Sequence, residues 1–105
     1  MAYSNAFTPV VDPATNTQTC VQVTTATAGA STKIKGNEVL ITCLTNPAYV
    51  RLGKVNSAAV SATNGYYMAI GAEVRWRPSR GADYLQYIRG SGTDGALSIA
   101  YGTGD

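Results

Sequence analysis

The chain of 105 residues contains no histidine. Histidine is the commonest general base near neutral pH and a frequent metal ligand, so its absence removes the usual catalytic triads and most zinc or iron sites. The acidic residues stand singly, without the spacing of a metal-binding loop. A tertiary pair such as Glu73 with Asp83 is the acidic arrangement left open. The sequence therefore predicts no enzyme, no metal site and no cofactor.

Charged residues are also scarce, at 13% of the chain against about 25% in a typical soluble domain. Threonine, serine, asparagine and glycine must then form the solvent face. A weakly charged surface resists association poorly, which favours a surface that a partner covers. Monomeric β-proteins with uncharged polar surfaces are the alternative. The net charge of +2 is too small to steer the whole molecule onto nucleic acid, but most basic residues fall in the second half of the chain, which leaves a local basic patch open.

Long apolar runs are missing as well. None approaches the roughly 18 residues that cross a bilayer, and the N-terminal residues lack the basic start and apolar core of a signal peptide. We therefore expect no membrane partner, and a product that stays in the compartment where it is made. Cys20 and Cys43 are then expected as reduced thiols. Alternation also places Cys43 with the apolar Val39 and Ile41 but Cys20 among glutamines, so the two thiols need not point the same way.

Short stretches with two-residue alternation are what the sequence contains, whereas a 3.6-residue period is absent over any useful length. Glycine, asparagine or proline ends each stretch. They predict strands near residues 18–23, 39–44, 48–52, 57–62, 66–70, 73–77, 83–89 and 96–101. About eight short strands favour an all-β, single-domain sandwich over residues 17–105, of jelly-roll or immunoglobulin-like type. A small closed barrel is the alternative.

Three local patterns give sharper predictions. Residues 39–44 are apolar on both faces, which is typical of a central strand covered on both sides. Asn64-Gly65 predicts a type I′ hairpin turn between the stretches 57–62 and 66–70. The small residues of 26–31, followed by a loop with Lys33 and Lys35, are predicted to be irregular.

The first sixteen residues differ from the remainder of the chain. They contain Pro9 and Pro13 and show no lasting period, so they predict an extended N-terminal arm that lies on the domain or on a neighbour. The apolar side chains with which this arm can make contacts are Tyr3, Phe7, Val10 and Val11.

Tyrosine is the one enriched side chain with binding potential, with seven copies beside a single tryptophan. In one interpretation the tyrosines pack within the sandwich and the arginines are scattered and solvated. In the other, tyrosines and arginines together form a protein interface, where tyrosine, tryptophan and arginine are over-represented. The candidate residues for such an interface are Tyr66, Tyr67, Arg75, Arg77 and Arg80.

About sixty residues, LTNPAYVRLG (44–53) and the stretch from residue 60 to the end, resemble a small virion protein of tailed bacteriophages. Such proteins carry a strand ending in Thr-Asn, a segment similar to FVRFG, a corner ending in glycine and a strand ending near proline. A small turn before an apolar strand and a terminal glycine-rich hairpin follow. The corresponding pieces here are residues 45–46, 49–53, 68–71, 74–78, 81–88 and 92–102.

The resemblance implies a β-sandwich decoration or cement protein. Proteins of this type bind the outside of an icosahedral head, contact the major capsid protein and tighten contacts between capsomers, often as trimers. The expected location is therefore the capsid surface of a virion assembled in the host cytoplasm. The family has no catalytic residues to carry over.

Two rival functions stay open at this point. A phage tail or neck component, or a receptor-binding module, can use the same sandwich with exposed aromatic loops for glycans. A binder of single-stranded nucleic acid would use tyrosine and arginine as a stacking platform.

Overall fold

The computed structural model describes residues 8–12, 14, 17–18, 20–26, 29–54, 60–78 and 82–103, and all its regular elements there are strands. Within these ranges no helix has the length and apolar character to span a membrane. The strands are β1 (Thr8–Pro9), β2 (Val11–Asp12), β3 (Thr17–Gln18), β4 (Cys20–Thr25), β5 (Ala30–Lys33), β6 (Glu38–Thr45), β7 (Ala48–Gly53), β8 (Tyr66–Met68), β9 (Glu73–Trp76), β10 (Tyr84–Arg89) and β11 (Gly95–Thr103).

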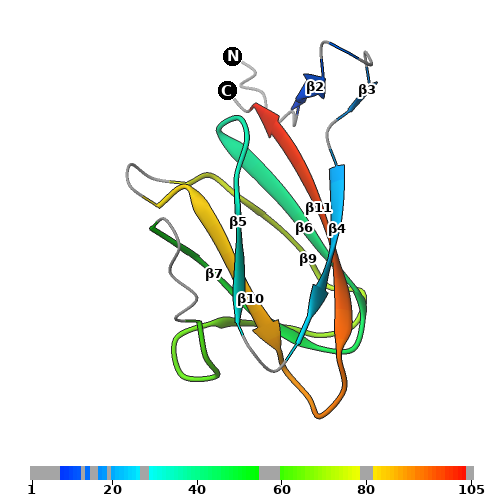
Figure 1. The fold of residues 1–105 in the computed structure, drawn as a ribbon, viewed down its shortest axis with the longest axis vertical. Helices are drawn as coiled ribbons and strands as arrows, with labels where there is room; N and C mark the ends of the chain where they lie inside the picture. Colours follow the sequence, from blue (N-terminus) through cyan, green and yellow to red (C-terminus); the bar gives the residue numbers. More distant parts are fainter. Residues whose placement is uncertain are drawn as a thin grey trace, which may run out of the picture.

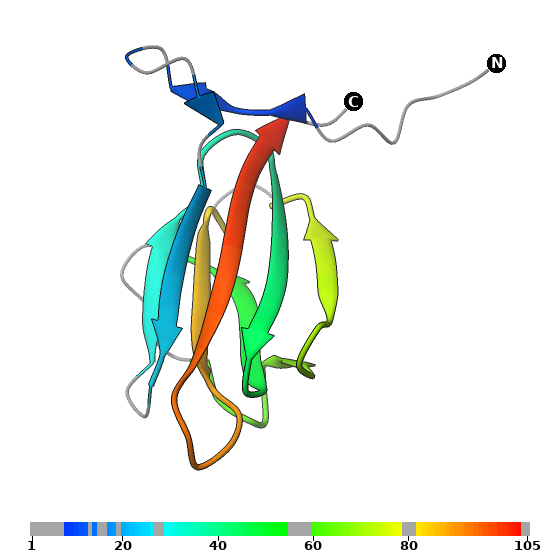
Figure 2. The same ribbon diagram turned by 90° about the vertical axis from the view of Figure 1, so that its right-hand side faces the viewer.

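The strands form two antiparallel sheets that pack face to face (Figures 1 and 2). The first, here called the β6 sheet, has the order β4-β11-β6-β9, and β1 pairs with the C-terminal end of β11. The second, the β7 sheet, has the order β5-β10-β7-β8. The short β2–β3 pair stands apart at one end of the sandwich (Figure 2).

The order of the strands identifies the sandwich as a jelly roll. From β4 to β11 consecutive strands alternate between the sheets, except that β7 and β8 share one. The eight strands thus lie in the orders 1-8-3-6 and 2-7-4-5, the double-sheet arrangement of jelly rolls. In an immunoglobulin-like sandwich the first two strands share a sheet. The predicted all-β sandwich is confirmed, and of the two types left open the structure has the jelly roll.

Inward-facing side chains of both sheets form one core. The register places Ile41 beside Ile99 in the β6 sheet and Leu52 beside Leu85 in the β7 sheet. Ile41, Ile99 and Leu85 have no solvent exposure. Burying an aliphatic side chain of this size stabilises the fold by about 1.5–3 kcal/mol, so these rows hold the two sheets together. The remaining core positions include Val39, Cys43, Val50, Met68, Leu97 and Tyr101.

The central position predicted for residues 39–44 is confirmed, since β6 lies between β11 and β9. The prediction that both of its faces are covered is wrong. Leu40 is half-buried and Leu44 is 40% exposed. The outer face of the β6 sheet has no described element packed over it, so the apolar run reflects only one buried face.

Besides the short β1 and β2 of the N-terminal segment, one strand of the sandwich was not predicted. Residues 30–33 form β5, although the small residues there show no apolar alternation. Pairing with β10 sets their conformation, with Thr32 opposite Leu85. The predicted strand 57–62 has no such counterpart, because residues 60 and 61 are not in a strand and 57–59 lie outside the described residues. The sandwich from β4 to β11 therefore has the eight strands that were expected, but β5 stands in place of the predicted strand 57–62.

The predicted type I′ turn is also wrong. Neither Asn64 nor Gly65 has a positive φ. Instead, the amides of Asn64 and Gly65 donate to the Ser61 carbonyl at 3.3 and 2.8 Å, and Asn64 Oδ1 accepts a 2.7 Å bond from the Ser61 amide. These hydrogen bonds hold the turn without left-handed backbone. The strand β8 that follows it pairs with β7, and not with the stretch 57–62 as the hairpin prediction required.

Part of the N-terminal segment is built into the sandwich. Pro9 pairs opposite Gly102, and the Val10 amide donates a 2.9 Å hydrogen bond to the Tyr101 carbonyl. The half-buried Val10 packs against the core. The β2–β3 pair joins Val11 to Gln18 across the boundary that the sequence placed after residue 16.

Both cysteines are reduced, as predicted. Cys43 is buried and Cys20 is exposed. Cys43 belongs to the inward row of β6, whereas Cys20 lies opposite Ala100 on the outward row. The two thiols therefore point to different sides of the β6 sheet.

Candidate interaction surface

The strands β8 and β9 end their respective sheets on the same side of the sandwich. The turn between them follows the end of β6 closely: the Gly71 amide donates to the Cys43 carbonyl at 2.8 Å, and the Cys43 amide donates to the Ala72 carbonyl at 2.9 Å. Gly71 has a φ of 84°, a conformation that favours glycine. We call this side the β8–β9 edge and define it by Tyr66, Tyr67, Ile70, Arg75, Trp76 and Arg77.

Aromatic rings close the β8–β9 edge. Tyr66 is opposite Val50 and Trp76 is opposite Val39, so both belong to inward-facing rows. Their rings meet edge to face with centroids 5.7 Å apart. The Tyr67 ring packs in the same manner on Tyr49, at 5.4 Å. Such pairs contribute about 0.5–1.5 kcal/mol beyond the burial of their area.

The same rings remain accessible. Tyr66 is 53% exposed, Tyr67 is 50% exposed and Ile70 is 62% exposed. Large apolar groups that are ordered by neighbours but half in water can bind a partner at little further cost in side-chain entropy. The edge therefore combines order with available apolar area.

Two arginines of the edge share one carboxylate. Arg75 Nε lies 3.9 Å and Arg77 Nη2 lies 3.5 Å from Glu38 Oε2. The Glu38 side chain is only 9% exposed, whereas the arginine side chains are 36% and 49% exposed. Two guanidinium groups on one carboxylate leave an excess positive charge at the surface. The second oxygen, Glu38 Oε1, is buried without a hydrogen-bond partner.

The structure places on this edge four of the residues that the sequence suggested, Tyr66, Tyr67, Arg75 and Arg77: Tyr66 packs on Trp76, Tyr67 packs on Tyr49 in the outward row of the β7 sheet, and both arginines contact Glu38. It does not bring the N-terminal residues to them in one patch: Val10 packs on the core, and Val11 lies 47% exposed in β2. Tyr3, Phe7 and Arg80 lie outside the described residues.

Sequence reasoning missed Ile70 and Glu38. Ile70 was predicted as the last residue of the strand 66–70, whereas the structure ends β8 at Met68 and places Ile70 in an exposed turn before Gly71. Glu38 precedes the apolar run of β6 and carried no local signal, because its two arginine partners come from residues far along the chain.

The outer faces of the two sheets differ in chemistry. On the β6 sheet, the rows through β4, β11 and β6 hold mainly uncharged residues: Cys20, Gln22, Thr24, Leu40, Thr42, Ala96, Ser98 and Ala100. The charged residues on this face are Glu38, at the start of β6, and Glu73 and Arg75 on β9. The outward row of the β7 sheet instead holds Lys33, Arg51 and Tyr84, together with the buried Gln86.

A polar contact within the β7 sheet has a structural role. Arg51 Nε donates a 2.7 Å hydrogen bond to Oε1 of the fully buried Gln86. The Gln86 amide lies over Gly53, where an added Cβ would come within 2.5 Å of Nε2. No group of three or more histidine, cysteine, aspartate or glutamate side chains able to hold a metal occurs within the ranges that the structure describes.

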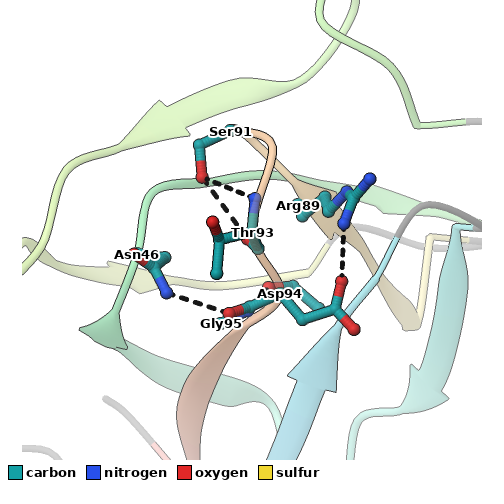
Figure 3. Close-up of polar contacts among 7 residues, drawn as sticks. Asn46, Arg89, Ser91, Thr93, Asp94 and Gly95 are labelled. Atoms are coloured by element: carbon teal, nitrogen blue, oxygen red, sulfur yellow. Dashed lines mark hydrogen bonds and ion pairs between the residues drawn. The ribbon is translucent and has the colours of Figure 1, made fainter.

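The end of the sandwich opposite the β2–β3 pair is held by polar contacts (Figure 3). Asn46 Nδ2 donates to the Asp94 carbonyl at 2.9 Å, and Arg89 Nη1 pairs with Asp94 Oδ1 at 2.9 Å. The Gly95 amide donates to Thr25 Oγ1 at 3.0 Å. These bonds fix the β10–β11 turn against the β6–β7 corner.

Comparison with known protein families and with curated proteins finds no match to this chain.

Proposed function

We propose that the chain is a structural virion protein that binds the outside of an icosahedral bacteriophage head as a decoration or cement protein. The observation that carries the proposal is the β8–β9 edge, where half-exposed aromatic rings are already ordered beside two arginines. Tyrosine, tryptophan and arginine are the residues in which binding energy concentrates at protein interfaces.

The fold supports the proposal without deciding it. Jelly rolls are common among viral capsid domains and lectins, but a fold hosts many functions. The segments that resemble a tailed-phage virion protein map onto the β6–β7 corner and the strands β8 to β11. The resemblance therefore covers the strands that form the β8–β9 edge.

In this proposal the protein acts by shape and adhesive area. The rings of Tyr66, Tyr67 and Trp76 would bury apolar surface against the major capsid protein, and Arg75 and Arg77 would pair with its acidic groups. Binding to the assembled head alone stabilises that head, because a ligand of one state shifts the equilibrium toward it. The trimer implied by the resemblance stays a prediction.

The experiment is a binding measurement on heads that lack the protein. Tyr67→Ser removes an exposed anchor, and Tyr84→Ser is the matched control, because Tyr84 lies two strands away in the same sheet. We expect Tyr67→Ser to weaken binding by about tenfold or more, as for an interface hot spot, while Tyr84→Ser binds like the parent. Equal binding by all three proteins would contradict the proposed surface.

A receptor-binding role at the tail is the second candidate, and one observation favours it. The half-exposed Tyr67 ring beside Tyr49 forms an aromatic platform in a fold that lectins also use. A glycan array and the position of the protein on the particle distinguish the two roles. Glycan binding that Tyr67→Ser abolishes, together with a location at the tail, would favour the second.

A further inference from the structure

The four edge strands of the sandwich are protected to different degrees. Natural sheets discourage edge-to-edge pairing with short strands, charges and prolines. The strand β9 carries Glu73 and Arg75 and is followed closely by Pro78, and β8 has only three residues. The strand β5 has four residues and ends in Lys33. The six residues of β4, CVQVTT, include no charge and no proline.

The interior row is also less covered at β4. Val21 lies opposite Ile99 and Val23 opposite Leu97, so both valines face inward. Val21 is nevertheless 37% exposed, whereas Ile99 has no exposure. Across the sandwich, the Tyr66 and Trp76 rings close the corresponding gap. Among the described strands, β4 pairs only with β11.

We propose that β4 pairs antiparallel with β4 of a second copy of this chain, so that the β6 sheets of two protomers become continuous. A second copy fits because β4 has no charge, and self-pairing therefore brings no like charges together. The contact is isologous, since the same strand serves on both sides of a two-fold axis. This inference concerns the chain alone and does not depend on the proposed capsid role.

The geometry restricts the register of this pair. Residues directly opposite in an antiparallel pair lie on the same face, so the two-fold axis passes through one residue and not between two. Within β4 the central choices are Gln22, which sets Val21 opposite Val23, and Val23, which sets Val21 opposite Thr25. Both registers cover the exposed flank of Val21.

One strand pair buries less area than the roughly 1,200 Å² of stable interfaces, so the dimer is weak and depends on concentration. Sedimentation velocity across a concentration series tests this. We expect the parent to shift from one-chain to two-chain mass, and Val21→Lys to raise the dissociation constant by about tenfold or more, because an inward charge blocks pairing. Ala62→Lys, an exposed turn position outside the edge strands, is the matched control.

A parent protein that stays monomeric at millimolar concentration would overturn the inference, as would a mass of three chains or a dimer that Val21→Lys leaves intact. Crosslinking covers the case in which Val21→Lys fails to fold. In a Cys20→Ser background, Gln22→Cys or Val23→Cys is expected to form an interchain disulfide, because opposed residues bring their Cα atoms within reach. Crosslinking by neither, above the level of Ala62→Cys, would overturn the inference.

Discussion

The rings of Tyr66 and Trp76, one from each sheet, meet edge to face at 5.7 Å and close the side of the sandwich between β8 and β9. Two roles meet in this pair. Its inward faces complete the core, and Tyr66 is still 53% exposed. The same two side chains therefore shield the core from water and supply exposed area at the proposed interaction surface.

The Tyr66–Trp76 contact is expected to contribute measurably to stability. A double-mutant cycle with Tyr66→Ala and Trp76→Ala should give a coupling free energy of about 0.5–1.5 kcal/mol in chemical denaturation. A cycle between Tyr66 and Tyr84, which no ring contact joins in the structure, is the control. A coupling no larger than that of the control would show that the rings do not support each other.

Glu38 is expected to matter more for stability than either arginine that it contacts. Glu38→Ala removes both ion pairs and leaves a cavity where a nearly buried side chain packed, and should lower the free energy of unfolding by about 1–3 kcal/mol. Arg77→Ala removes a half-exposed partner and should cost about 1 kcal/mol or less. Urea titrations of both variants provide the measurement, and a larger loss for Arg77→Ala would contradict this assignment.

Asn46 has a positive φ of 51° and donates to the Asp94 carbonyl, so it serves the β6–β7 corner in two ways. Asn46→Ala loses the hydrogen bond and strains the backbone, and should lower the melting temperature and the unfolding free energy, by about 1–3 kcal/mol. Asn46→Gly loses the bond but tolerates the conformation, and should be the less damaged variant. The reverse order would refute the role of the backbone conformation.

Stability is expected to fall in alkaline solution. Burial raises the pKa of the Cys43 thiol above 9.0, and burial followed by the charge of Tyr101 raises the pKa of Tyr87 above 10.0. Above these values the unfolded chain loses protons that the folded chain retains, so each contribution is complete below the unfolded pKa and is lost as pH rises through the folded one. The slope per group reaches at most about 1.4 kcal/mol per pH unit.

The variant that tests this pH dependence is Cys43→Ala, with Cys20→Ser as the control at an exposed thiol. Denaturant titrations between pH 8 and about 10.5 should give a shallower decline for Cys43→Ala than for the parent, beginning above the ordinary thiol pKa. An unchanged slope in Cys43→Ala would show that the buried thiol does not contribute.

Alternation predicted the strands whose inward residues are apolar and whose outward residues are polar or small. The strands β7, β9 and β11 follow this pattern closely, with Val50 and Leu97 inside and Arg51 and Arg75 outside. It also indicated that Cys20 and Cys43 need not share a face, and the structure places them on opposite faces. Local sequence suffices for these strands because alternation within a strand decides whether each side chain faces the core or the solvent.

Long-range pairing explains what the sequence did not predict. The conformation of β5 comes from its hydrogen bonds with β10, and nothing within Ala30–Lys33 indicates that partner. The contact of Glu38 with Arg75 and Arg77 likewise joins β6 to the far end of β9. Asn64 was misleading because its side chain, and not its backbone conformation, completes the turn.

The most direct test of the proposed role is the amount of this chain in purified particles, measured by quantitative mass spectrometry against the major capsid protein. A shell decoration predicts a stoichiometry in fixed proportion to the capsid subunits, which Tyr67→Ser lowers and Tyr84→Ser does not. An abundant protein that stays unattached in infected cells, or one present only at the few copies of a tail, would contradict the account.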